Sequence, residues 1–272
     1  MTASDSLPPA WEPLTPRGVA AFTRAKASRL LLVQFLVTLI VAAAVVWLLY
    51  DGCFPTVREA LRQMPAEGEI RSGKLNWRGE SPQLLAEGRF LAFTVAVDHA
   101  GDIRSPAHLQ LEFGQDHFFA HSLFGYATRR YPHRGIIPFN RTELLPKWDA
   151  WQPALLALAA VGVVVSLLLG WFVLATVYAG PAWLVGFFAN RDLKLCASWK
   201  LAGAALMPGA LLLAGAILLY DFGVLDLVQM AFVFGGHLVL GWIYLGISPL
   251  FLPRHSTAVV AGKNPFAPPP VA

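Results

Sequence analysis

Two histidines four residues apart, His117 and His121, are the first candidates for chemistry in this sequence. Asp116 directly precedes them, and histidine with a carboxylate is a typical ligand set for zinc. On a helix the two rings would be neighbours, but the surrounding residues have the composition of a strand. Strand residues four apart lie about 13 Å from each other, too far to share one ion. We therefore predict no metal site here.

Paired carboxylates would offer another route to catalysis, with one acting as acid and the other as base. The acidic residues of the region 51–150 are interleaved with arginines and lysines, a pattern typical of a solvated mixed-charge surface. The sequence has no Gly-rich phosphate loop and no nucleophilic serine elbow. We predict no catalytic residues and no cofactor. An enzyme that uses Glu112, Asp116, His117 and His121 remains an alternative.

The composition indicates an integral membrane protein. Of the 272 residues, 56% are hydrophobic and only 14% are charged, and the mean hydropathy is +0.53; soluble domains are nearer one quarter charged. The net charge is +4, but the region 51–150 holds 12 basic and 12 acidic residues. The excess of positive charge therefore flanks the apolar runs, which argues against a nucleic-acid partner and points to membrane lipids.

Four apolar runs are long enough to cross a bilayer, for which about 20 residues are needed. None of them contains a charged residue. The predicted transmembrane helices are 30–50, 153–178, 201–220 and 227–249.

The basic residues predict the orientation of these helices. They precede the first helix, follow the fourth, and occur between the second and third, whereas the turn 221–226 is acidic. Positive segments remain in the cytoplasm. We therefore expect a cytoplasmic, disordered basic tail (1–29), a cytoplasmic Pro-rich tail (250–272) and an extracytoplasmic region 51–150.

The segment after the second helix stays apolar beyond Gly180 and Pro181. A continuous helix through it would be about 55 Å long, against a hydrocarbon core of about 30 Å. Gly-Pro is a natural break, so we predict an interfacial cytoplasmic helix over 182–200, with Trp183 and Trp199 at headgroup level. A fifth, short membrane segment is the alternative.

The fold class that follows is a membrane α-helical protein with an inserted α+β domain. Residues 55–64 have helical spacing of apolar side chains after a proline. After them, strand-like segments alternate with polar turns such as 98–102. We expect one helix against a small antiparallel sheet, between the first and second transmembrane helices. The candidate strands are 69–77, 90–97, 109–113 and 117–124.

His237 is the most suggestive residue inside a predicted membrane helix. An ionisable group there is a functional candidate by default. Asp221 and Asp226 lie near the outer end of the same helical hairpin. A neutral histidine that is hydrogen-bonded to a neighbouring backbone would, however, cost little.

Small residues recur at helical spacing in three of the predicted membrane helices. Such spacing lets helix backbones approach closely, in a packed bundle or an oligomer. Pro208 is expected to kink the third helix. The helix-packing candidates are Gly162, Ser166, Gly170, Ala205, Gly209, Gly236, Gly241 and Gly246.

Three motifs resemble a known family. They are Ile70–Leu75 (I-x-x-G-x-L), Val97–Asp102 (VDHAGD) and Ser198–Leu213 (SWKLAGAALMPGALLL). The order of parts resembles the bacterial membrane proteins grouped as domain of unknown function 1189, and the C-terminal block is distantly similar to the Yip-type membrane domain. The resemblance implies a multi-pass protein of the bacterial cytoplasmic (inner) membrane, and it carries over no catalytic residues.

Three functions remain open from the sequence. The first is a non-enzymatic scaffold, assembly or accessory subunit that binds other membrane subunits or copies of itself through the small-residue faces. The second is a transporter or lipid-handling protein that works as an oligomer, suggested by His237, Pro208 and the acidic turn. The third is the envelope enzyme described above.

Overall fold

The computed structural model describes residues 9–97, 103–122 and 124–254. The predicted turn 98–102 and the Pro-rich segment beyond residue 254 lie outside the described residues. The chain divides into two compact units. The first consists of Met1–Thr38, Ser166–Leu213 and Ala231–Ala272, and the second of Leu39–Val165 and Ala214–Met230.

Four helices are long and apolar enough to cross a membrane, and a small sheet region accompanies them, which confirms the coarse architecture expected from the sequence. The four are Ala27–Gln63, Arg141–Phe188, Leu195–Asp221 and Leu227–Phe251. Divided at their irregularities, the helical elements of the described chain are α1 (Pro16–Ala21), α2 (Ala27–Trp47), η2 (Leu48–Cys53), α3 (Phe54–Gln63), α4 (Arg141–Phe188), α5 (Leu195–Ala205), α6 (Met207–Asp221), α7 (Leu227–Ile247) and η3 (Ser248–Phe251).

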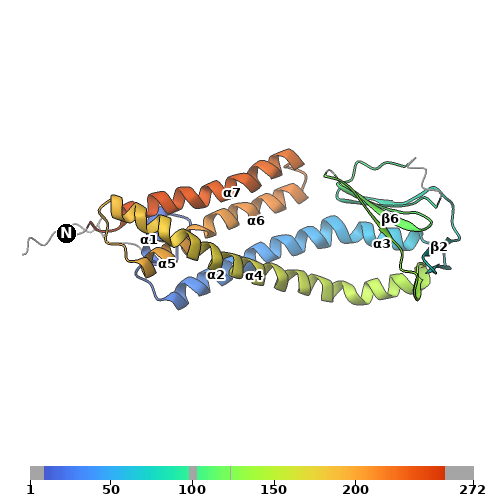
Figure 1. The fold of residues 1–272 in the computed structure, drawn as a ribbon, viewed down its shortest axis with the longest axis horizontal. Coiled ribbons are helices and arrows are strands. Elements are labelled where there is room, and N and C mark those ends of the chain that lie inside the picture. Colours follow the sequence, from blue (N-terminus) through green and yellow to red (C-terminus); the bar gives the residue numbers. More distant parts are fainter. Residues whose placement is uncertain (1–8, 98–102, 123, 255–272) are drawn as a thin grey trace, which may run out of the picture. The chain divides into compact units, whose positions relative to one another are not determined.

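Helix α4 differs from the expectation at both ends. It begins at Arg141 and continues through Gly180 and Pro181 to Phe188 without a break (Figure 1). A proline removes one helical hydrogen bond, but in apolar surroundings a break would leave several backbone groups unpaired, which costs more. The predicted separate helix 182–200 is therefore wrong. Its first residues belong to α4, and α5 begins only at Leu195.

Two prolines mark the irregular points of the other long helices. The η2 segment is a π-helix in which Phe54 N donates to Leu49 O, and Pro55, which has no N–H, follows directly. The chain therefore stays helical where a separate helix was expected. The third candidate span is interrupted at Leu206, two residues before Pro208.

The predicted disordered tail 1–29 contains a helix, α1, which corrects the prediction for the residues described there, 9–29. Helix α1 begins after Thr15, whose hydroxyl accepts a 3.0 Å hydrogen bond from Gly18 N. Its residues Val19 and Ala20 are fully buried. Apolar residues within a basic tail gave the local signal for this helix.

The sheet region contains two sheets. The five-stranded sheet has the order β3-β4-β5-β6-β7 and the three-stranded sheet the order β2-β1-β8. The strands are β1 (Gly68–Arg71), β2 (Lys74–Trp77), β3 (Gln83–Glu87), β4 (Leu91–Val95), β5 (Leu109–Phe113), β6 (His117–Ser122), β7 (Gly125–Arg130) and β8 (Ile136–Pro138).

Two details correct the expected antiparallel sheet. Strands β4 and β5 pair in parallel, because the connection between them is long enough to cross over, for which a dozen or more residues are needed. The predicted strand 69–77 is a hairpin, since Ser72 and Gly73 have positive φ angles of 52° and 76° and form its turn.

The core of residues 54–150, here called the sheet domain, is built by α3 together with residues of both sheets. Helix α3 is strongly amphipathic and buries Ala60 and Leu61. The buried residues of this core are Ala60, Leu61, Met64, Ile70, Leu75, Leu85, Ala86, Val95, Tyr131 and Phe139.

Candidate functional site

The turn between α6 and α7 carries the two acidic residues noted in the sequence. Asp226 caps α7, because its Oδ1 accepts a 2.7 Å hydrogen bond from Gln229 N. A second hydrogen bond runs in the opposite direction, because Gln229 Oε1 accepts a 2.9 Å bond from Asp226 N. This reciprocal capping satisfies backbone N–H groups at the helix start, so Asp226 has a structural role.

Arg89, which follows β3 in the sheet domain, binds the C-terminal end of α6. Its Nη1 donates a 2.6 Å hydrogen bond to the carbonyl oxygen of Tyr220, and its Nη2 donates a 2.8 Å bond to that of Leu225. The last carbonyls of a helix have no partner within the helix and carry partial negative charge. The Tyr220 carbonyl is one of these, whereas the Leu225 carbonyl belongs to the turn that follows α6. One guanidinium can bind both because its donors form a fixed fork.

Aromatic rings surround this guanidinium. It lies 4.7 Å from the ring centre of Tyr220 and 5.4 Å from that of Phe90. The ring of His108 stacks on Tyr220 at 5.8 Å with an interplanar angle of 11°, and Nδ1 of His108 and the Tyr220 hydroxyl are hydrogen-bonded at 2.8 Å. These four residues, Arg89, Phe90, His108 and Tyr220, are called the Arg89 cluster below.

Burial and the neighbouring Arg89 charge both lower the pKa of His108. Each disfavours the imidazolium form and so favours the neutral imidazole. A neutral ring stacked on Tyr220 and next to a guanidinium avoids repulsion between two cations. The cluster therefore contains one permanent charge, on Arg89, and that charge is used to hold helix α6.

Gly52 in η2 is the close neighbour of this cluster. A Cβ atom at Gly52 would lie 2.5 Å from the Phe90 ring and 2.7 Å from Oδ1 of Asp221. Real Cβ atoms do not come so close to ring or oxygen atoms. Only glycine fits this approach.

The histidines that opened the sequence analysis lie on one face of β6 and do not meet. The ring of Phe119 lies between them, 6.1 Å from His117 and 6.1 Å from His121. His117 Nδ1 is 2.6 Å from Asp116 Oδ1, and Arg130 Nε donates a 3.1 Å bond to its Nε2.

His121 instead pairs with the buried Glu112, with 3.3 Å from Nε2 to Oε2. The exposed Asp116 has a lowered pKa, chiefly because His117 hydrogen-bonds its carboxylate. In the part of the chain that the structure describes, no three histidine, cysteine, aspartate or glutamate side chains are placed to hold a metal ion.

His237 is bonded within its own helix, with Nδ1 against the carbonyl oxygen of Phe234. Its main chain meets the third candidate span, because a Cβ at Gly209 would lie 2.5 Å from the carbonyl oxygen of His237. Gly241 similarly faces Leu206 and Ala205, with distances of 3.6 and 3.8 Å.

Other small residues named from the sequence have no neighbour of this kind. In the part of the chain that the structure describes, a Cβ would meet nothing within 4 Å at Gly162, Gly170, Gly236 and Gly246. Ser166, between the first two of these on α4, is exposed. The small-residue face of α4 is therefore open among residues 9–97, 103–122 and 124–254.

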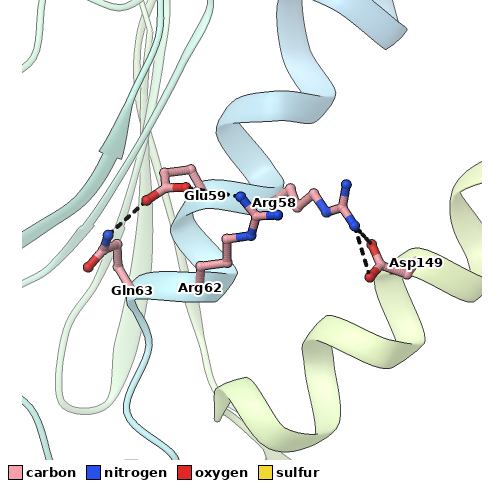
Figure 2. A network of polar contacts seen from close by, with 5 residues as sticks. All are labelled: Arg58, Glu59, Arg62, Gln63 and Asp149. Atoms are coloured by element: carbon pink, nitrogen blue, oxygen red, sulfur yellow. Dashed lines mark hydrogen bonds and ion pairs between the residues drawn. The ribbon is translucent and has the colours of Figure 1, made fainter.

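A groove of about 540 Å³ was not foreseen from the sequence, and it is here called the α3–α4 groove. An ion pair joins α3 to α4 beside it, with Arg58 Nη2 lying 3.2 Å from one oxygen of Asp149 and 3.3 Å from the other (Figure 2). The groove is lined by Tyr50, Asp51, Phe54, Pro55, Arg58, Glu59, Arg62 and Gln152.

The sequence analysis also missed the Arg89 cluster. Arg89 stands in a region of mixed charge and His108 has no charged residue beside it in the sequence. Nothing local distinguishes them, because their partner Tyr220 is more than 100 residues away in the chain.

No protein-family model matches the chain, and comparison with curated proteins and with solved structures finds no significant match.

Proposed function

We propose that this chain is a multi-pass protein of the bacterial cytoplasmic membrane that acts as a non-enzymatic assembly or accessory subunit. In this proposal both termini are cytoplasmic and the sheet domain is extracytoplasmic, in agreement with the distribution of basic residues. The helices associate with other membrane chains or with another copy, and the sheet domain presents a surface outside.

The open small-residue face of α4 is the observation that best supports this function. Only 6% of the most apolar stretch of α4 is buried, against 61% for the span Leu195–Asp221. On this face Gly162, Ser166 and Gly170 follow one another at intervals of four residues. In lipid, helices associate through close packing at such faces rather than through the hydrophobic effect.

The Arg89 cluster supports the same function in a second way. Arg89 ties the sheet domain to the end of α6, so a protein bound to the sheet domain would be held at a fixed place relative to the α6–α7 turn. Rigid attachment of this kind suits a subunit that positions partners.

Native co-purification tests the proposal. The full chain, tagged at its C-terminus, is extracted in a mild detergent and its bound proteins are identified and counted by mass spectrometry. We expect a stoichiometric partner or a defined oligomer, and the double variant Gly162→Ile with Gly170→Ile to lose it.

The matched control is Ala157→Ile, an exposed position on the other side of α4, which should keep the assembly. A wild-type chain that purifies as a lone monomer would contradict the proposal, as would equal losses for the control and the double variant.

A further inference from the structure

The α3–α4 groove lies where two candidate membrane spans change from apolar to polar residues. Tyr50 and Asp51 follow the apolar part of α2, and Gln152 precedes that of α4. Beside them Trp47 and Trp151 are 45% and 64% exposed. Exposed tryptophans at the ends of apolar helices are typical of the headgroup level of a bilayer.

The walls of the groove are tied together without a ligand. Figure 2 shows Arg58 reaching from α3 to Asp149 on α4. One turn earlier on α3, Phe54 makes an edge-on ring contact with Trp148 of α4 at 4.9 Å. A groove with fixed walls can select a ligand because little ordering is needed on binding.

The charges that remain for a ligand are of both signs. The charge of Arg58 is matched by Asp149, which leaves Arg62, Asp51 and Glu59. The ion pair of Arg62 Nη1 with Glu59 Oε2 is 3.7 Å long, beyond hydrogen-bond distance. Arg62 and Glu59 are about half exposed, at 54% and 47%. Glu59 Oε1 accepts a 2.7 Å hydrogen bond from Gln63 Nε2 (Figure 2), so Glu59 Oε2 and the Arg62 guanidinium are the groups that can turn to a ligand.

We infer that the α3–α4 groove binds the headgroup of a zwitterionic phospholipid with a primary amine, phosphatidylethanolamine. Arg62 donates hydrogen bonds to the phosphate. The carboxylates of Asp51 and Glu59 accept hydrogen bonds from the ammonium group. The acyl chains lie along the apolar part of α2 or α4. This inference rests on the proposed membrane location.

Charge and donor chemistry select this lipid over two others. An anionic phosphatidylglycerol would place a net negative charge beside the two carboxylates of Asp51 and Glu59, where Arg62 is the one lining arginine that Asp149 does not already neutralise. Phosphatidylcholine has the required charges, but its quaternary ammonium has no N–H to donate to Asp51 or Glu59.

Native mass spectrometry of the purified full chain in detergent tests the inference. Phosphatidylethanolamine, phosphatidylcholine and phosphatidylglycerol with the same acyl chains are added in turn. We expect phosphatidylethanolamine to bind at least about tenfold more tightly than the others, and Arg62→Gln or Asp51→Asn to reduce its binding about tenfold.

The control is Arg71→Gln, which breaks an exposed ion pair of the same kind, with Glu69 on β1. It should bind as the wild type does. Equal binding of the three lipids, preference for phosphatidylglycerol, or an equal loss in the control would overturn the inference.

If Arg62→Gln does not fold, Asp51→Asn still tests the inference, because it removes the proposed contact with the ammonium group. The measurement needs no protein partner, so its result is independent of the co-purification that tests the assembly function.

Discussion

Nη1 of Arg89 donates a 2.6 Å hydrogen bond to the carbonyl oxygen of Tyr220, which lies 131 residues later in the chain. Nη2 of the same guanidinium donates to the carbonyl oxygen of Leu225. One side chain of the sheet domain therefore bonds a backbone carbonyl on each side of the α6–α7 turn. The contact thus fixes the turn to the sheet domain.

Arg89→Gln should destabilise the protein, because two carbonyl oxygens lose a charged donor. Hydrogen bonds to charged groups each contribute about 1.5–3 kcal/mol, and we expect a loss within that range because both groups are near the surface. Arg89→Lys should recover little, since an ammonium lacks the fork. Thermal unfolding in detergent measures both variants. The exposed Arg104 gives the matched control Arg104→Gln, and an equal loss there would contradict the role of Arg89.

Gly52→Ala should destabilise the protein, because its Cβ would meet the Phe90 ring at 2.5 Å and Asp221 Oδ1 at 2.7 Å. Overpacking of this kind costs about 1–3 kcal/mol. In α6, Gly215 has nothing within 4 Å, so Gly215→Ala should be neutral or stabilising, by up to about 1 kcal/mol. The melting temperature of Gly52→Ala should fall below that of the wild type, and that of Gly215→Ala should stay the same or rise. If both variants melt alike, the close approach at Gly52 is not a constraint.

We expect the free energy of unfolding to decrease in mild acid, because His108 is harder to protonate in the folded protein than in the unfolded chain. Its pKa in the folded protein is lowered from 6.5 by burial and by Arg89. The unfolded chain therefore binds a proton more readily than the folded one, and stability rises with pH across this window. The contribution is complete above about pH 6.5 and declines as the pH falls below it. Melting temperatures measured from pH 7.5 to 5 should decline less in His108→Gln than in the wild type; a parallel decline would show that other groups cause the effect.

The proposed orientation can be tested with thiol chemistry. Tyr126 on β7 is 72% exposed, and Cys196 on α5 is exposed. In intact cells made permeable only at the outer membrane, a charged maleimide should label the Tyr126→Cys variant, with Cys53 and Cys196 changed to serine. It should not label Cys196 in a Cys53→Ser chain until the cells are lysed. Labelling of Cys196 before lysis would reverse or refute the orientation.

Several elements were visible in the sequence because their causes are local. An apolar run that can cross a bilayer depends on its own composition and length, and all four candidate spans were found from it. The strand Leu109–Phe113 was also found, with the same ends as observed. The start of α4 had a local signal that was overlooked, because Asn140 Oδ1 accepts a 2.9 Å hydrogen bond from Glu143 N in a capping pattern.

Other elements depend on partners that the local sequence does not show. Strand β7 is exposed along its whole length and ends in two arginines, and the short β8 exists through its pairing with β1. Neither has the alternation that identifies a strand. The parallel pairing of β4 with β5 is likewise a property of the assembled sheet.

The sequence by itself determined where the chain is apolar enough for a membrane and where its small residues recur, since both are properties of consecutive residues. Only the tertiary structure decided that α4 leaves Gly162 open while Gly209 meets the backbone of His237. The tertiary structure alone also brought Arg89 to Tyr220 and formed the α3–α4 groove. These contacts link residues that are far apart in the chain, and their energies arise only when folding brings the groups within a few ångströms.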